Sequence, residues 1–287
     1  MKPFPGEDSN IGILGLRKLN QLTTSLYDFD LKSYATTSLL RGIEAVIKKN
    51  NLRDIDALIH LLENRSSFFP VFQSQLTFSC TELFRDPAFW RSFSDDVLPL
   101  INKLNSKIRI WVPGCSSGEE AISAAIIIYE AGLCDKTSVY VSGINDLSIK
   151  RARNKIYQDK QLEISENNYK RFRNDENTSI SEYLIRKDSG FVFKDDLYEN
   201  IRFEVFNASE TPEIRGLHVV LCRNYFIYCA PEYQNYLLGR FTNSLIPGGF
   251  LAIGNKEDIS FCNDFSKYMV FNKKEKIFQK KQNSTGF

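Results

Sequence analysis

The sequence predicts an α/β fold in which a mostly parallel sheet follows a small helical domain. Three observations support this prediction. From residue 107 onward, short apolar runs typical of strands alternate with longer helical stretches. The first 75 residues show instead the 3.6-residue apolar spacing of amphipathic helices. Near residues 174–196, a polar stretch with a hairpin turn interrupts the alternation.

Residues 1–75 are expected to form the helical domain, and residues 76–287 the second domain. The segment "SLLRGIEAVIKK" (38–49) places Leu39, Ile43 and Ile47 on one apolar stripe. The segment "NLRDIDALIHLLENR" (51–65) follows the same period. Such helices bury their apolar stripes against one another, so the pattern predicts a small helical bundle.

Five apolar runs are predicted to be the strands of the sheet: "IRIWV", "SVYVSGI", "IRFEVF", "HVVLC" and "FLAIG". Helical stretches such as "EEAISAAIIIYEAG" and "PEYQNYLLGRFTNSL" separate them, which is the order of a parallel sheet. In such sheets ligands bind beyond the carboxyl ends of the strands. The small-residue loop after "IRIWV" is therefore expected to line a ligand site.

The polar interruption is predicted to contain a β-hairpin. Its strands are "YLIRK" and "FVFK", and its turn uses Asp188, Ser189 and Gly190. Two interpretations stay open: a solvated excursion from the sheet, or a docking edge for an extended peptide by strand addition.

Two adjacent acids, Glu119 and Glu120, follow the loop in "IRIWVPGCSSGEEAIS" (108–123). A loop of this kind normally presents backbone N–H groups and a helix N-terminus to a phosphate, which these carboxylates would repel. We therefore expect a ligand that is neutral or cationic where it touches the loop. The alternative is that the acids only offset the helix dipole.

Composition excludes several classes of function. A net charge of +2 over 287 residues gives no indication of nucleic-acid binding. No apolar stretch approaches the ~20 residues of a membrane span, and the first residues lack the pattern of a signal peptide, so a cytoplasmic protein without membrane insertion is expected. Six cysteines without a CxxC pair, and only two histidines, predict reduced thiols and no metal site.

Five segments in order carry a family resemblance: "LTFSCTELFRDPAFW", "IWVPGCSSGEEAIS", "SGINDLSIKRARNKIY", "VVLCRNYFIYCAPEYQNYLLGRF" and "LIPGGFLAIGNKED". Over nearly the whole chain, the sequence resembles the CheR family of chemotaxis receptor methyltransferases. The resemblance implies a Rossmann-like class I methyltransferase domain with an inserted small β-subdomain and an N-terminal helical domain. It also implies the cofactor S-adenosyl-L-methionine (SAM), the product S-adenosyl-L-homocysteine, and methylation of glutamate side chains on the acidic cytoplasmic helices of chemoreceptors.

The resemblance also assigns site residues. It implies that Arg85 and Tyr228 are catalytic, Arg85 by orienting the acceptor carboxylate and Tyr228 by lying near the transferable methyl group. SAM carries a sulfonium and an ammonium group, so a carboxylate at Glu120 would attract it. The cofactor-binding residues implied are Ser79, Thr81, Arg85, Glu120, Asp146, Asn207, Ala208, Arg223 and Asn224.

Several positions depart from the family pattern. Gly143 stands where an acid would grip the cofactor ribose, the next family acid is Asn145, and Asp146 lies one residue further along. Ser79, Ala208 and His218 replace a family asparagine, leucine and aspartate. These departures predict weakened cofactor binding, or a catalytically retired copy that binds a receptor or signalling partner.

The implied chemistry requires alignment rather than proton transfer. A glutamate carboxylate has a reference pKa of about 4.3 and is already ionised at pH 7. Methyl transfer to it gains most from holding the reacting atoms in line and close together. Another carboxylate or a small molecule as acceptor is equally compatible with the fold. The sequence leaves the acceptor protein and the oligomeric state open.

Overall fold

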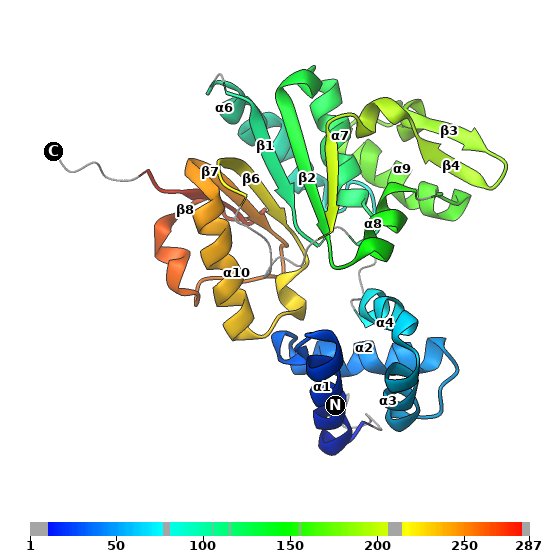
Figure 1. Cartoon of the computed structure of the whole chain (residues 1–287). Coiled ribbons are helices and arrows are strands. Elements are labelled where there is room, and N and C mark those ends of the chain that lie inside the picture. The colour runs from blue at the N-terminus through cyan, green and yellow to red at the C-terminus, as the bar shows by residue number, and fades with distance from the viewer. Residues whose placement is uncertain are drawn as a thin grey trace, which may run out of the picture. The chain divides into compact units, whose positions relative to one another are not determined.

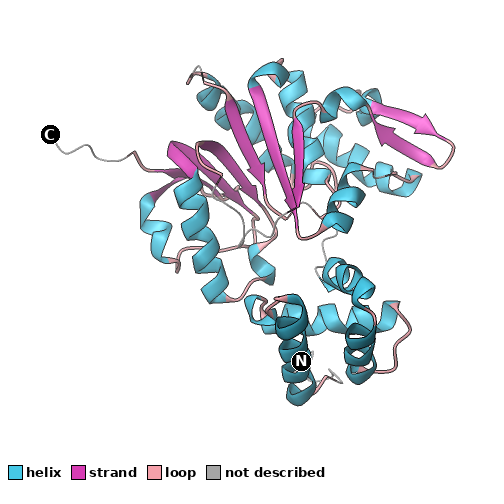
Figure 2. Cartoon of the chain, in the orientation of Figure 1, coloured by secondary structure: helices cyan, strands magenta, loops and turns pink. Residues whose placement is uncertain are grey.

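The computed structural model describes residues 11–76, 81–104, 106–114, 116–154, 156–205 and 214–282. The chain divides into two compact units. Residues 1–78 and 226–236 form the first, and residues 79–225 and 237–287 form the second. The first unit is helical and the second holds the sheet (Figures 1 and 2).

The first unit is built on four helices whose apolar stripes face one another. Its buried side chains include Leu19, Ile43, Leu58 and Phe72, one from each helix. Gly42 is required where two of the helices approach, because a Cβ atom there would lie 2.5 Å from the backbone oxygen of Leu76. The helices are α1 (Ile13–Tyr27), α2 (Thr36–Lys49), α3 (Ile55–Asn64) and α4 (Phe69–Leu76).

The second unit contains a seven-stranded sheet in the order β5-β2-β1-β6-β7-β9-β8. The first five strands in this order pair in parallel, and the last two pair antiparallel. The α/β prediction is therefore correct, although strands β8 and β9 were not predicted. The strands are β1 (Ile108–Val112), β2 (Thr137–Gly143), β5 (Ile201–Val205), β6 (Leu217–Cys222), β7 (Leu245–Ile253), β8 (Tyr268–Asn272) and β9 (Ile277–Lys280).

Helices cover both faces of this sheet (Figure 2). Alternation along β1 sends Ile110 and Val112 to a core shared with α7. It sends Trp111 to the other face, where its ring centroid lies 5.3 Å from that of Phe241 in α10. The helices assigned wholly or partly to this unit are α5 (Pro87–Ser92), α6 (Leu98–Asn102), α7 (Glu119–Glu130), α8 (Asp146–Arg153), α9 (Asp159–Arg173) and α10 (Pro231–Ser244).

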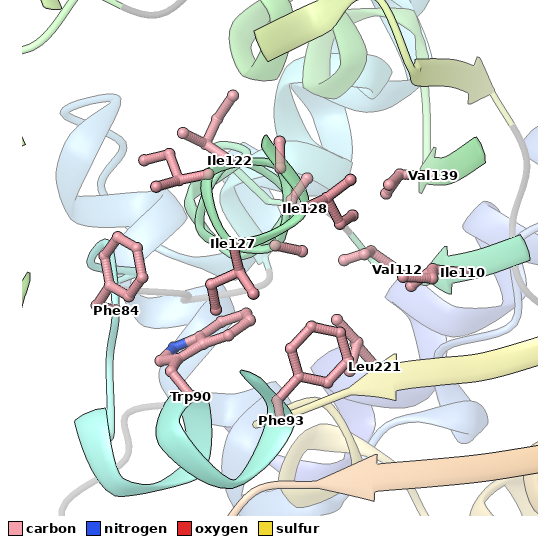
Figure 3. Close-up of a cluster of buried hydrophobic side chains, with 14 of the residues drawn as sticks. Phe84, Trp90, Phe93, Ile110, Val112, Ile122, Ile127, Ile128, Val139 and Leu221 are labelled. Carbon is pink, nitrogen blue, oxygen red and sulfur yellow. The ribbon is translucent and has the colours of Figure 1, made fainter. Parts of the chain in front are cut away.

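Figure 3 shows a cluster of buried hydrophobic side chains in the second unit. Ile127 of α7 points toward Trp90, Ile122 extends from another side of the same helix, and both side chains are buried. A helix that is apolar around most of its circumference must be enclosed on most sides. This burial fixes the start of α7, and with it the loop that precedes the helix.

The predicted hairpin consists of β3 (Leu184–Lys187) and β4 (Gly190–Phe193), which pair antiparallel. Lys187 pairs with Gly190, so Asp188 and Ser189 form a two-residue turn. The backbone of Phe191 exchanges hydrogen bonds of 2.8 and 2.9 Å with that of Tyr157, which attaches β4 to the rest of the unit.

Two glycines in helix interiors provide a matched test of the packing. Gly42→Ala should lower the free energy of unfolding by about 1–2 kcal/mol, because the new methyl group clashes with the end of α4. Gly239→Ala in α10 should raise it by about 0.5–1 kcal/mol, because the nearest atom is 3.8 Å away and alanine favours helix. Urea unfolding followed by circular dichroism measures both. Equal effects of the two substitutions would contradict the close approach of α2 and α4.

Candidate functional site

The polar residues of interest gather where strand order reverses. From β1 the chain proceeds to β2 and β5 on one side, and then returns to β6 and β7 on the other. Neighbouring strands β1 and β6 therefore lead away in opposite directions, which opens a crevice at their carboxyl ends. The loop 113–118 leaves β1 there, and Arg223 and Asn224 leave β6.

The backbone of loop 113–118 is tightly turned. Gly114, Ser116 and Gly118 all have positive φ, at 67°, 46° and 93°. A Cβ atom on Gly114 would lie 2.8 Å from the ring of Tyr225, and one on Gly118 would lie 3.0 Å from the backbone oxygen of Ala152. Glycine is therefore needed at both positions for conformation and for space.

The two adjacent acids have different environments. Glu119 is 2% exposed, and its carboxylate accepts hydrogen bonds from the hydroxyls of Thr81 and Ser117, the latter at 2.7 Å. The two hydroxyls also lie 2.9 Å apart. Thr81, a predicted cofactor residue, and Glu119 thus hold the loop in place.

Glu120 is the acid left for a ligand. Its Oε1 is buried and has no hydrogen-bond partner among the described residues, and the nearest cationic atom is Arg223 Nη1, 4.0 Å away. Burial raises the pKa of this carboxyl to about 8, assisted by Glu257 and Asp86 and opposed by Arg223 and Arg85. A buried acceptor in this state favours a cationic donor as ligand.

Arg223 only partly offsets the effect of burial on Glu120, and other groups engage it more closely. Its Nη2 lies 2.6 Å from Asp86 Oδ2, and its Nη1 donates to the carbonyl oxygen of Arg85 at 3.3 Å. Its guanidinium lies 3.9 Å from the ring centroid of Phe89. Arg223 therefore fixes the turn that carries Arg85.

A buried acid that the sequence analysis missed supports the end of β6. Glu257 is 3% exposed, and its Oε2 accepts the backbone N–H groups of Asn224 at 3.0 Å and Gly254 at 2.5 Å. These contacts hold Asn224 at a φ of 58°. The sequence could have indicated Glu257, because it lies in "GNKED", a loop that directly follows a predicted strand.

The last residue of β2 carries no carboxylate. Gly143 is the last residue of the strand and pairs with Val205. The side chain of Asn145 caps α8, with its Oδ1 accepting the Ser148 N–H at 2.9 Å. Asp146, a predicted cofactor residue, is exposed.

His218 proves to be a structural residue. It lies near the start of β6, where its ring bonds Ser106 Oγ at 2.9 Å and the Arg109 N–H at 3.2 Å. The cofactor crevice lies at the opposite end of this strand. The histidine is thus no evidence of a lost cofactor contact.

The structure brings together five of the predicted site residues: Thr81, Arg85, Glu120, Arg223 and Asn224. Ser79, Asn207 and Ala208 lie outside the described residues. Tyr228 belongs to the first unit, in a 3-10 helix (Phe226–Tyr228) where its carbonyl accepts the Ala35 N–H at 2.8 Å.

Comparison with known proteins identifies the family. Residues 79–276 match the family described as CheR methyltransferase, SAM binding domain. The chain belongs to this family.

Named relatives support the assignment. A protein of Pseudomonas putida named as a candidate methyltransferase, Cher3, is 29% identical over 88% of this chain and 92% of its own length. A chemotaxis protein methyltransferase of Listeria monocytogenes is 27% identical over 80% of this chain and 84% of its own. One from Vibrio parahaemolyticus is 26% identical, with coverage of 82% and 84%.

This CheR-type chain is therefore a SAM-dependent methyltransferase, and the crevice fits that cofactor. The Oε1 of Glu120 has no hydrogen-bond partner among the described residues, so it suits the ammonium group of SAM as an acceptor. Among the helices within the described residues, none has the length and apolar character needed to span a bilayer.

The raised pKa of Glu120 predicts pH-dependent cofactor binding. At pH 7 the free protein holds this carboxyl mostly neutral, and pairing with a cation requires its ionised form. SAM affinity should therefore rise from pH 6 toward pH 8, with release of a proton on binding. Titration calorimetry should show Glu120→Gln binding about 10- to 100-fold more weakly at pH 8, with a flatter pH profile.

The stability of the cofactor-free protein should fall as pH rises, whereas SAM affinity rises. The folded pKa of about 8 exceeds the ordinary value of 4.5, so this group's contribution to stability is lost as pH rises through that interval. At pH 8 and above, Glu120→Gln should accordingly melt higher than the wild type. Glu63→Gln, at an exposed site on α3, is the control for both measurements. Unchanged SAM affinity in Glu120→Gln would contradict the assignment.

Proposed function

We propose that this protein transfers the methyl group of SAM to glutamate side chains of chemotaxis receptors, as a protein-glutamate O-methyltransferase. The observation that carries the proposal is the position of Arg85. Its charge acts on the cofactor-directed Glu120, and its side chain also lines a cavity of about 780 Å³ that can admit an acceptor. The chemotaxis methyltransferases among the relatives support receptors as acceptors. An acidic cytoplasmic helix of a receptor, and hence a cytoplasmic enzyme, is part of the proposal.

The residues would act by binding and orientation. Bound SAM supplies an electrophilic methyl group on a sulfonium centre. Glu120 would hold its ammonium group, and Arg85 would orient the acceptor carboxylate through paired N–H donors. With the acceptor held there, its carboxylate oxygen would bond to the methyl carbon as the carbon–sulfur bond broke, and that electron pair would stay on sulfur. No proton would move, so the residues of the site would not need to supply a general base.

Tyr228 enters the proposal through the family motif alone. It remains our proposed second catalytic residue, placed by the resemblance near the transferable methyl group. Ser79, Asn207 and Ala208 likewise remain proposed cofactor contacts.

Weakened cofactor binding is a further part of the proposal, since β2 ends at Gly143 without a carboxylate. This feature also favours a second candidate function, a CheR-type module that binds a receptor or signalling partner without catalysis. Measured SAM affinity separates the two.

Arg85→Ala should abolish methyl transfer, because the acceptor carboxylate loses its orienting group. With methyl-labelled SAM and a receptor cytoplasmic fragment, the wild type should deposit label that alkali releases as methanol, as expected of a carboxyl ester. Arg85→Ala should lose at least about 100-fold in rate, a larger effect than any loss of SAM-induced thermal stabilisation from its implied cofactor contact. Arg153→Ala, at an exposed site on α8, is the control. Alkali-stable label would reject glutamate as the acceptor.

Gly143→Asp tests the missing ribose contact. Gly143 lies in an extended strand, so its backbone accepts a side chain without a positive φ. Restoring the carboxylate should tighten SAM binding by about 2 kcal/mol, roughly thirtyfold. Asp146→Ala tests whether this neighbouring acid has taken over the contact, in which case it would weaken SAM binding and Gly143→Asp would add little. No effect of Gly143→Asp would show that the ribose is held elsewhere, and no SAM binding by either protein would favour the non-catalytic module.

A further inference from the structure

Five cations surround the cavity on which Arg85 lies. They come from three elements besides the Arg85 turn: α5, the last turn of α9, and the turn between β8 and β9. Because these elements are far apart in sequence, the convergence of charge does not follow from the composition of any one segment. We call this cavity of about 780 Å³ the basic pocket, and its cations are Arg85, Arg91, Lys170, Arg171 and Lys274.

Most of these cations lack a carboxylate partner, although the basic pocket also contains acids. Asp86 is paired with Arg223 at 2.6 Å, and Glu82 Oε2 accepts the Asn168 amide at 3.3 Å. Within the described part of the chain, no carboxylate forms an ion pair with any of four cations: Arg91, Lys170, Arg171 and Lys274. Two further acids, the exposed Glu176 and the buried Glu275, also line the pocket, so its cations exceed its acids by one. Because Asp86 is paired with Arg223, the remaining charge of the pocket favours an incoming anion.

Helix dipoles account for only part of this arrangement. Lys170 and Arg171 lie in the last turn of α9, where positive charge is favourable. Lys274 lies in a β-turn, and α5 continues directly into the next helical turn, so neither Lys274 nor Arg91 offsets a free helix end.

A buried carboxyl oxygen in the basic pocket restricts which anions fit there. Glu275 lines the basic pocket, is 4% exposed, and its Oε2 has no hydrogen-bond partner among the described residues. A fitting ligand supplies anions to the cations and a donor to this oxygen. An acidic polypeptide does both, through its side-chain carboxylates and main-chain N–H groups. A polyphosphate has no donors.

We propose that the basic pocket binds acidic residues flanking the acceptor glutamate, and so selects which carboxylate reaches Arg85. This inference rests on the proposed function, because it takes Arg85 as the group that orients the acceptor. Its partner is an acidic segment of a polypeptide. Since Arg171 and Lys274 are exposed, they act on acceptor affinity and association and not on the chemical step.

Charge removal with matched controls tests the proposal. The double variant Arg171→Ala with Lys274→Ala should raise KM for a receptor fragment about tenfold, with kcat and the Kd for SAM unchanged. The control pairs Lys160→Ala with Lys273→Ala, exposed positions on α9 and beside Lys274 that do not line the pocket. The difference should vanish near 1 M salt, where the Debye length is about 3 Å. Equal KM values for the double variant and its control would overturn the proposal.

A binding measurement separates this proposal from the methylation on which it rests. The probe is a fluorescent Glu-rich helical peptide, compared with the same peptide carrying Gln at every Glu, in the presence of S-adenosyl-L-homocysteine. The wild type should bind the Glu peptide more tightly, and the double variant should lose this preference. Equal binding of the two peptides by a wild type that forms methyl esters overturns the basic pocket alone. A preference without any ester formation overturns the proposed function and retains the pocket as an acidic-peptide site.

Discussion

The ion pair between Arg223 and Asp86 is the contact on which the site depends. It joins the carboxyl end of β6 to the turn that carries Arg85, across 2.6 Å and 137 residues of sequence. Phe89 packs against the guanidinium, whose side chain is only 3% exposed. A charge buried this deeply is tolerated only with its partner in place, so the pair forces the two segments together.

The ion pair of Arg223 with Asp86 helps to explain why the pKa of Glu120 is raised. At 4.0 Å, Arg223 is too far from Glu120 for a hydrogen bond, and burial dominates the pKa of this carboxyl. The turns around the crevice also hold Phe84, Asp86, Ser116 and Asn224 at positive φ, which is unfavourable for residues other than glycine. A buried carboxyl group without a hydrogen-bond partner and a strained backbone both lower the stability of the cofactor-free protein. Binding of a cation would recover part of that free energy.

The periodicity of apolar residues was sufficient to predict the core strands of the sheet. It was insufficient to predict the contacts between residues of the site. Runs such as "IRIWV" and "HVVLC" are mostly buried strands with a clear apolar signal. Strand β8 lies at the edge of the sheet and β9 lies next to it, and polar and charged residues break the apolar pattern there, as in "IFQK". Adjacent acids on a helix point about 100° apart. Glu119 and not Glu120 forms the contacts within the protein because Thr81, which is distant in sequence, donates a hydrogen bond to it.

The prediction for His218 failed for a related reason. The sequence did not show that this side chain lies at the end of the strand opposite the crevice.

The small net charge of the chain conceals a local separation of charge that suits the proposed methyl transfer from a cationic cofactor to an anionic acceptor. A cationic cofactor and an anionic acceptor need opposite potentials, and at low effective dielectric each would be repelled by the other's site. Arg85 lies at the boundary, since it acts on the carboxyl of Glu120 and also lines the basic pocket. Its turn is held by Arg223 through Asp86 and through the Arg85 carbonyl, so these contacts fix where Arg85 leaves the main chain. A cation fixed at this boundary can act on two ligands of opposite sign.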